Sequence, residues 1–157
     1  MHVIKVMNIS EFKSLLAKSE FTPKEILAFL AKDKECEVRA SVAKNPSTSK
    51  EILELLAKDK VLYVRSSVTQ NPKTPKDILK VIAKDKYWYV RATVAQNLNA
   101  SKEILELLAK DKDWHVRTSV ARNLKTPKEI LEVLAKDENY FVHSYVVQNP
   151  NTPKRDS

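Results

Sequence analysis

Residues 48–73 read TSKEILELLAKDKVLYVRSSVTQNPK, and this stretch returns along the chain with a constant step of 26 residues. Equivalent stretches begin at Thr22, Thr74, Ala100 and Thr126, with no insertion between them. A gapless period of this length is typical of repeat proteins, in which each unit packs on the next. We therefore expect a cap segment at 1–21, five repeats at 22–47, 48–73, 74–99, 100–125 and 126–151, and a truncated tail at 152–157.

Each repeat carries the signals of a first helix. In Thr74-Pro75-Lys76-Asp77 the threonine is expected to cap the helix, the proline to open it and the acid to suit its positive end. Repeats with glutamate at the last of these positions would form a capping box. Apolar residues then recur so densely, as in residues 52–57, that this helix is predicted to be buried on most of its circumference.

A second, shorter helix follows, from about Tyr63 to Gln70 in this repeat. Val64 and Val68 are four residues apart and are expected to face inward. Asparagine ends this helix in every repeat, and because the chain has no glycine we expect asparagine to supply a left-handed C-cap. The cap segment is expected to hold one further helix, over residues 8–18.

The composition excludes several classes of function. A chain without glycine cannot form a Walker loop or a dinucleotide-binding fingerprint. The single cysteine, Cys36, cannot form an internal disulfide, and the histidines are scattered, so we expect no catalytic site, metal or cofactor. The net charge of +8 comes mostly from lysine, whereas specific nucleic-acid recognition favours arginine. No apolar run approaches the ~20 residues of a membrane span, and we expect a cytoplasmic protein with no membrane partner.

The recurring string VRxSVAxNPxTPxxILxxLAKD resembles the leucine-rich repeat variant family and, more broadly, HEAT-like repeats, over residues 22–150. The resemblance implies an all-α, right-handed α-solenoid of helix pairs. HEAT-like repeats also place an aspartate at the turn between the helices and an arginine six residues later. The matching residues are Asp33 and Arg39, Asp59 and Arg65, Asp85 and Arg91, and Asp111 and Arg117. Asp137 is followed by His143 instead, so this ladder is expected to end there.

The aspartate and arginine ladder has two interpretations. The arginines could form a row that binds phosphates, or they could form ion pairs that tie each turn to its neighbour. We favour the structural role, because every arginine has its own aspartate at constant spacing and a partly buried charge needs a partner.

The three residues before each Val-Arg pair vary from repeat to repeat. With Val64 and Val68 inward, Tyr63, Ser66 and Gln70 are expected to point away from the core, on the concave face that second helices line in HEAT-like stacks. The predicted partner-binding residues are Tyr63, Gln70, Tyr89, Gln96, His115, Arg122, Phe141 and Gln148. Aromatic side chains suit an interface. Alternatively they pack across the joints between repeats, and the positions of Trp88 and Trp114 favour this.

These patterns indicate a non-enzymatic repeat scaffold that binds a protein or peptide through the second-helix face. One alternative is nucleic-acid binding on the same face, with bases stacked on the aromatic row. Another is a designed or consensus-like repeat protein without a natural ligand, since the repeats are unusually alike.

Overall fold

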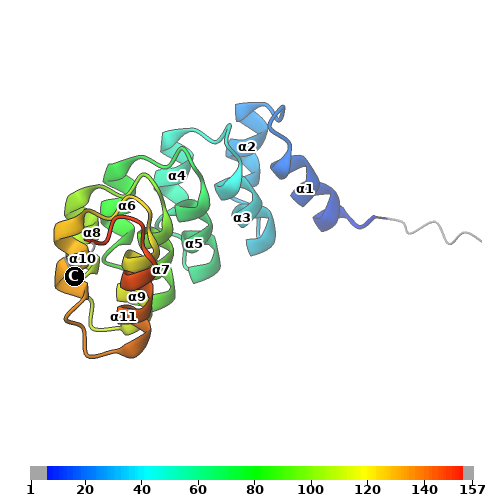
Figure 1. The fold of residues 1–157 in the computed structure, drawn as a ribbon. Helices are drawn as coiled ribbons and strands as arrows, with labels where there is room; N and C mark the ends of the chain where they lie inside the picture. The colour runs from blue at the N-terminus through cyan, green and yellow to red at the C-terminus, as the bar shows by residue number, and fades with distance from the viewer. Residues whose placement is uncertain (1–6, 154–157) are drawn as a thin grey trace, which may run out of the picture. The chain divides into compact units, whose positions relative to one another are not determined.

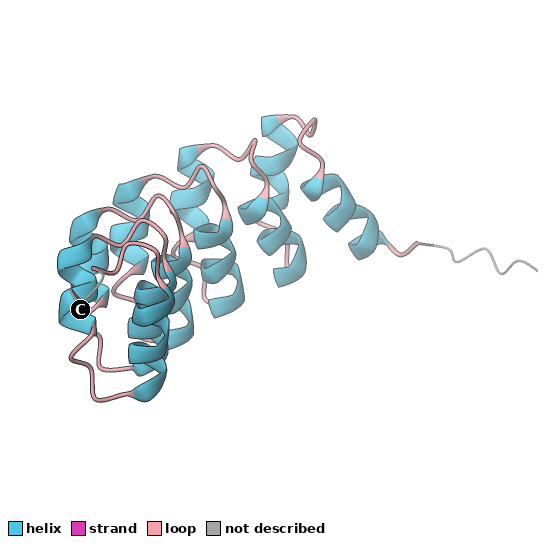
Figure 2. Ribbon diagram, viewed as in Figure 1, coloured by secondary structure: helices cyan, strands magenta, loops and turns pink. Residues whose placement is uncertain are grey.

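The computed structural model describes residues 7–153, and every element of regular structure in that range is a helix (Figures 1 and 2). The first six residues of the expected cap segment and the last four of the expected tail lie outside the described residues. The helices found between residues 7 and 153 are α1 (Ile9–Lys18), α2 (Lys24–Leu30), α3 (Cys36–Lys44), α4 (Lys50–Leu56), α5 (Leu62–Gln70), α6 (Lys76–Ile82), α7 (Trp88–Gln96), α8 (Lys102–Leu108), α9 (Trp114–Arg122), α10 (Lys128–Leu134) and α11 (Tyr140–Gln148). The prediction of an all-helical repeat fold is confirmed.

The chain divides after Asn71 into two compact units. In the first unit the longer helices α1, α3 and α5 pack side by side, with α2 and α4 beside them. In the second unit α7, α9 and α11 pack side by side in one row, and α6, α8 and α10 form a second row that packs against the first (Figure 1). None of the helices described is both long and apolar enough to cross a membrane.

The core of each unit lies between its two rows of helices. Leucine and isoleucine of the shorter helices, such as Leu53 and Leu56, meet the valines of the longer ones, such as Val64 and Val68, and all four are almost fully buried. The stripe on the shorter helices is narrower than the sequence predicts, because Leu55 is 49% exposed. Leu55 follows Leu53 by two residues, and so lies about 200° around the helix from it. The equivalent exposed residues are Phe29, Val81, Leu107 and Val133.

The threonine that begins four of the five repeats does not cap the first helix, so this expectation is wrong. The N-cap residue is the following proline or serine, as at Ser49. Thr48 is buried, and its hydroxyl donates to the carbonyl of Val42 at 2.6 Å. Thr126 donates to Val120 in the same way. The threonine thus satisfies a carbonyl at the end of the preceding helix, where helices leave such groups unpaired. Among the described helices, α1 alone has a capping box.

The backbone conformation of the recurring asparagine also differs from the left-handed C-cap that we predicted. No described residue has positive φ, and Asn45 is an extended C-cap with φ −68° and ψ 125°. Its side-chain amide donates to the carbonyls of Ala17 and Ser19 at 2.7 and 2.8 Å, and its side-chain oxygen accepts the N–H of Ser47. Asparagine is therefore selected by its side chain, which bridges successive repeats, and not by its tolerance of left-handed backbone. The same bridge is made by Asn71, Asn123 and Asn149.

Candidate interaction surface

The structure splits the predicted binding row of each repeat into two exposed ends. The aromatic or histidine side chain lies in the first turn of the longer helix, and Tyr89 is 41% exposed there. The long polar residue is the last of the helix, and Gln70, Gln96, Arg122 and Gln148 are all exposed. The small residue between them is buried in α5, α7 and α9, with Ala92 5% and Thr118 8% exposed, contrary to the expectation that it points outward, whereas Ser144 in α11 is half-buried. The close packing of neighbouring long helices leaves room there only for a small side chain.

In the second unit, adjacent aromatic residues at the start of α7, α9 and α11 form one continuous stack. The indole of Trp88 stacks on the imidazole of His115, with ring centroids 4.3 Å apart. On its other side His115 meets Trp114, at 3.6 Å, and Trp114 stacks on Phe141, at 5.1 Å. Edge-to-face contacts complete the stack. We call this set the aromatic ribbon, and its members are Trp88, Tyr89, Trp114, His115, Tyr140 and Phe141.

The ribbon packs between repeats and is exposed to solvent at the same time. Its ring faces meet one another, yet Trp88 is 40%, Phe141 53% and Tyr140 76% exposed. The rings therefore present mainly their edges and the open end of the stack to solvent. The two sequence-based interpretations of the aromatic residues, packing and exposure, both describe part of this arrangement.

Polar side chains at the N-caps of α9 and α11 accept backbone hydrogen bonds from the residues that carry the ribbon. The carboxylate of Asp113 accepts the backbone N–H of His115 at 3.0 Å and lies 2.9 Å from its ring Nδ1. Asn139 accepts the backbone N–H of Phe141 at 2.9 Å. These side chains satisfy helix N–H groups that have no partner within the helix. The first turns of α9 and α11, which carry ribbon residues, are thus held in place.

The first unit has a sparser version of this surface. Tyr63 is 41% exposed, and the Lys44 ammonium lies 5.1 Å from the centroid of its ring. One repeat earlier, the positions of the ribbon are occupied by Cys36 and Glu37, which are not aromatic. Burial, followed by the hydrogen bond with Glu37, raises the pKa of the Cys36 thiol, so this cysteine is not set up as a nucleophile.

The polar ends of the long helices make contacts between repeats. The Gln96 amide lies 3.4 Å from the Ser119 hydroxyl, and the Arg122 guanidinium lies 5.0 Å from the centroid of the Tyr145 ring. The sequence analysis grouped these residues with the aromatic row. In the structure they lie about 10 Å further along each helix, the length of seven residues. They form a separate surface from the ribbon.

The ladder arginines are engaged on all sides. The Arg39 guanidinium donates to both carboxylate oxygens of Asp59 at 2.6 and 3.0 Å, and to the carbonyls of Asp33 and Lys34. Each such arginine thus binds its own turn and the aspartate of the following repeat. Arg91 with Asp111 and Arg117 with Asp137 repeat this geometry. Because each of these guanidinium groups is already bound to a carboxylate and to the backbone of its own turn, the geometry supports the structural role of the ladder over a row that binds phosphates.

The ladder reaches further than the sequence expectation at both ends. Asp137 is a rung, because it receives Arg117 from the preceding repeat. Lys13 on α1 provides an earlier rung, with its ammonium 2.7 Å from Asp33. Its hydrogen bond lowers the pKa of Asp33, and that of Arg117 lowers the pKa of Asp137. Lys13 was not found from the sequence because α1 lacks the Val-Arg motif that marks the other rungs.

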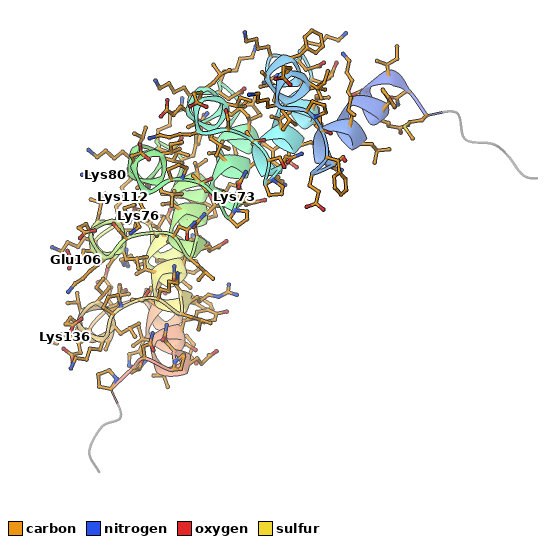
Figure 3. All side chains as sticks on the ribbon, turned by 90° about the horizontal axis from the view of Figure 1, so that it is seen from above. Lys73, Lys76, Lys80, Glu106, Lys112 and Lys136 are labelled. Atoms are coloured by element: carbon orange, nitrogen blue, oxygen red, sulfur yellow. The ribbon has the colours of Figure 1, made fainter. Side chains whose placement is uncertain are left out.

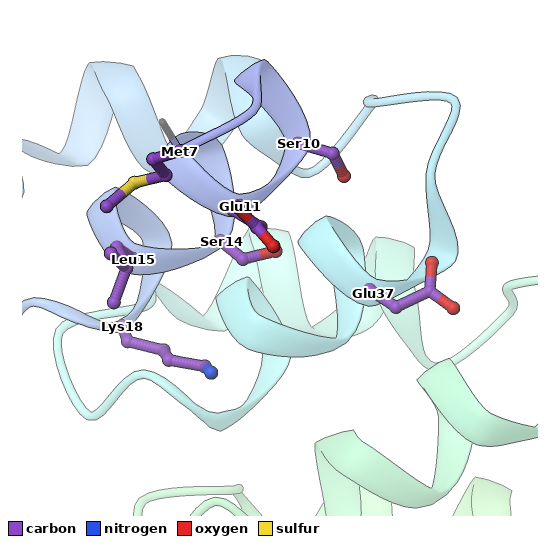
Figure 4. A pocket seen from close by; sticks show the side chains of 7 residues that line it. All are labelled: Met7, Ser10, Glu11, Ser14, Leu15, Lys18 and Glu37. Carbon is purple, nitrogen blue, oxygen red and sulfur yellow. The ribbon is translucent and has the colours of Figure 1, made fainter. Parts of the chain in front are cut away.

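A shallow hollow lies on α1. It has a volume of about 490 Å³ and is lined partly by the exposed apolar side chains Met7 and Leu15, with Glu37 of α3 across from them (Figure 4). The rest of its lining is polar and comes from α1, at Ser10, Glu11, Ser14 and Lys18. Within residues 7–153 no group of three histidine, cysteine or acidic side chains is placed to hold a metal ion.

Comparisons with known proteins find solved structures with the same fold, and one of them can be described in detail. It is described as a leucine-rich repeat variant with a novel repetitive protein structural motif, and it superposes with a TM-score of 0.69 and 28% sequence identity. The alignment covers 93% of this chain, which spans 58% of the length of that structure. No protein-family model matches the sequence, and no curated protein is significantly similar to it. This match confirms the resemblance read from the repeat string: the chain is a helical-repeat protein, and its fold is similar to that of the leucine-rich repeat variant.

Proposed function

We propose that this chain is a non-catalytic interaction scaffold that binds a protein or peptide through the aromatic ribbon of its second unit. The observation that supports this most directly is the ribbon itself, a continuous set of rings over three repeats in which Trp114 and His115 are half-buried and the other members are exposed. Tryptophan and tyrosine are enriched among the residues that contribute most to protein interfaces. Because the rings already restrain one another, binding costs them little further side-chain entropy.

A peptide fits the ribbon better than a nucleic acid does. Bases bind to aromatic side chains by stacking on open ring faces, and here both faces of His115 are covered by Trp88 and Trp114. The two tryptophans of the ribbon also carry indole N–H groups, which are hydrogen-bond donors. A peptide supplies carbonyl oxygens for such donors and apolar side chains for the ring edges.

The proposal is tested by selecting peptides from a random display library on the intact chain and measuring their affinities by fluorescence anisotropy. Trp114→Ala is expected to weaken binding by at least about tenfold, as removal of an interface hot spot does. The matched control is Leu98→Ala, which removes another exposed apolar side chain outside the ribbon. If Trp114→Ala and Leu98→Ala have the same small effect, the ribbon is not the binding surface.

Labelled single- and double-stranded oligonucleotides test the alternative, in which the ligand is a nucleic acid. They are titrated at about 50 and 200 mM salt, a range over which counterion release changes nucleic-acid affinity strongly. We expect weak binding that Tyr89→Ala does not change. Tight, salt-sensitive binding weakened by Tyr89→Ala would replace the peptide with a nucleic acid as the ligand.

A further inference from the structure

One repeat reverses a charge that its neighbours keep. The fourth residue after the first lysine of the shorter helix is glutamate in α4, α8 and α10, at Glu54, Glu106 and Glu132, but in α6 it is Lys80. In α4 and α8 the lysine and glutamate pair, with Lys50 3.7 Å from Glu54 and Lys102 3.9 Å from Glu106. In α6 the corresponding residues are Lys76 and Lys80, and like charges at this spacing repel. A local conflict of this kind is expected where a site serves a function.

The two lysines border a groove between α6 and α8. The groove has a volume of about 360 Å³, and its lining combines Ile104 and Leu107 with the lysines 76, 80 and 84 and with polar residues of both helices. Figure 3 shows Lys76 and Lys80 on the same outer side of the second unit as Glu106. The Ser101 hydroxyl and, more weakly, the ammonium groups of Lys76 and Lys80 lower the pKa of Glu103. The positive potential of α6 thus reaches across the groove to α8.

The next groove offers an internal comparison. Between α8 and α10 a hollow of about 240 Å³ has Ile130 and Val133 in the same apolar positions, but Glu106 stands where the first groove has Lys80. The two grooves have equivalent apolar residues, but the first is larger and carries the additional lysine. The charge at this position is therefore a feature by which a ligand can distinguish the first groove from the second.

We infer that the groove between α6 and α8 is a second interaction surface, which receives a short acidic peptide segment carrying an apolar side chain. The apolar side chain packs on Ile104 and Leu107, and the carboxylates of the segment meet Lys76, Lys80 and Lys84. The shorter helices are only about 10 Å long, so the groove takes a short segment and not a long helix. Charge complementarity of this kind contributes specificity and faster association.

A nucleic acid fits this groove less well. Its phosphates would approach the carboxylates of Asp77 and Glu103, which line the groove, and would leave the exposed side chain of Leu107 uncovered. A peptide can cover the leucine and place its acids only where the lysines are. The groove lies on the shorter helices, and the inference does not depend on the aromatic ribbon.

The test uses the intact chain and two labelled peptides of equal length, one made of leucine and glutamate and the other of leucine and lysine. We expect the glutamate peptide to bind and the lysine peptide not to. Lys80→Glu should lower the affinity for the glutamate peptide by about tenfold or more, since it reverses a charge at the contact. Leu107→Ser should also weaken it, and Val133→Ser in the next groove should not.

Two controls separate the groove from the overall positive charge. Lys136→Glu makes the same change in net charge outside the groove and should alter affinity less than about twofold, because exposed charges beyond a Debye length are screened. Lys80→Glu should fold normally by circular dichroism, since three of the other four repeats carry glutamate there. Equal losses for Lys80→Glu and Lys136→Glu would overturn the inference. So would an oligonucleotide that binds the groove in a Lys80-dependent manner while the glutamate peptide does not bind.

Discussion

Arg91 occupies a position where a charge is nine-tenths buried and every partner is a fixed group of the protein. Arg91→Ala leaves the carboxylate of Asp111 without its bidentate partner, and breaking such a buried pair costs about 3–5 kcal/mol. We expect a loss of this size in the free energy of unfolding, measured by urea denaturation. Arg122→Ala, at an exposed position, should cost under about 1 kcal/mol. An Arg91→Ala chain as stable as the wild type would contradict the structural role of the ladder.

The ladder carboxylates also predict how stability depends on pH. Burial acts to raise the pKa of Asp111, but its hydrogen bonds with Arg91 and with the backbone of Asp113 hold that pKa below its ordinary value. The pKa of Asp137 is lowered in the same way by Arg117. The unfolded chain therefore takes up protons first as the pH falls, and stability decreases below about pH 5. Asp137→Asn should make this acid-side slope of the unfolding free energy shallower, and an unchanged slope would count against the pairing.

The recurring asparagine gives a third test at the scale of the residue. Asn123 is extended, with φ −69° and ψ 121°, and its amide donates to the buried carbonyl of Ala95 at 2.7 Å. Glycine would suit a left-handed cap, but here it would remove the bridge and leave that carbonyl unsatisfied, at a cost of about 1–3 kcal/mol. Denaturation of Asn123→Gly measures this loss. A chain stabilised by the glycine would restore the left-handed interpretation.

At the scale of the element, the aromatic ribbon couples helices that are a full repeat apart in sequence. Trp114 and Phe141 stack between α9 and α11, and such pairs contribute about 0.5–1.5 kcal/mol beyond their buried area. A double-mutant cycle with Trp114→Ala and Phe141→Ala should show a coupling of this size in the free energy of unfolding. Additive effects would mean that the two rings contact each other without stabilising the joint.

The helices themselves could be predicted from the sequence, because their signals are local. The apolar period and the proline and asparagine at the ends located the second helix of 48–73 to within one residue of α5. The contacts that could not be predicted from the sequence are those between one repeat and the next. The stacking of Trp88 on His115, and the pairing of Arg39 with the aspartate of the following repeat, follow from how helices dock. A single repeat, considered alone, contains no information about that registry.

At the scale of the whole molecule, each unit is stabilised by contacts between adjacent helices. In the second unit α9 packs between α7 and α11, and in the first unit α1 packs on α3. Since the stability of a repeat array is a sum over neighbours, helices with fewer neighbours open more readily. We expect amide hydrogen exchange to be faster in α1 and α11 than in α9, as measured by mass spectrometry. Uniform protection along the chain would contradict nearest-neighbour stabilisation.

The side-chain bridges have a consequence for how such a chain can change its length. An arginine reaches the aspartate 20 residues ahead, and an asparagine reaches carbonyls 26 and 28 residues behind. A duplicated segment of 26 residues brings a complete set of donors and acceptors, so every bridge on either side finds an equivalent partner. An insertion of any other length leaves a guanidinium and two carbonyls without one. Growth by whole repeats is therefore nearly neutral for stability, whereas small insertions and deletions are costly, and a lineage of such chains would vary in the number of its repeats while keeping their length fixed.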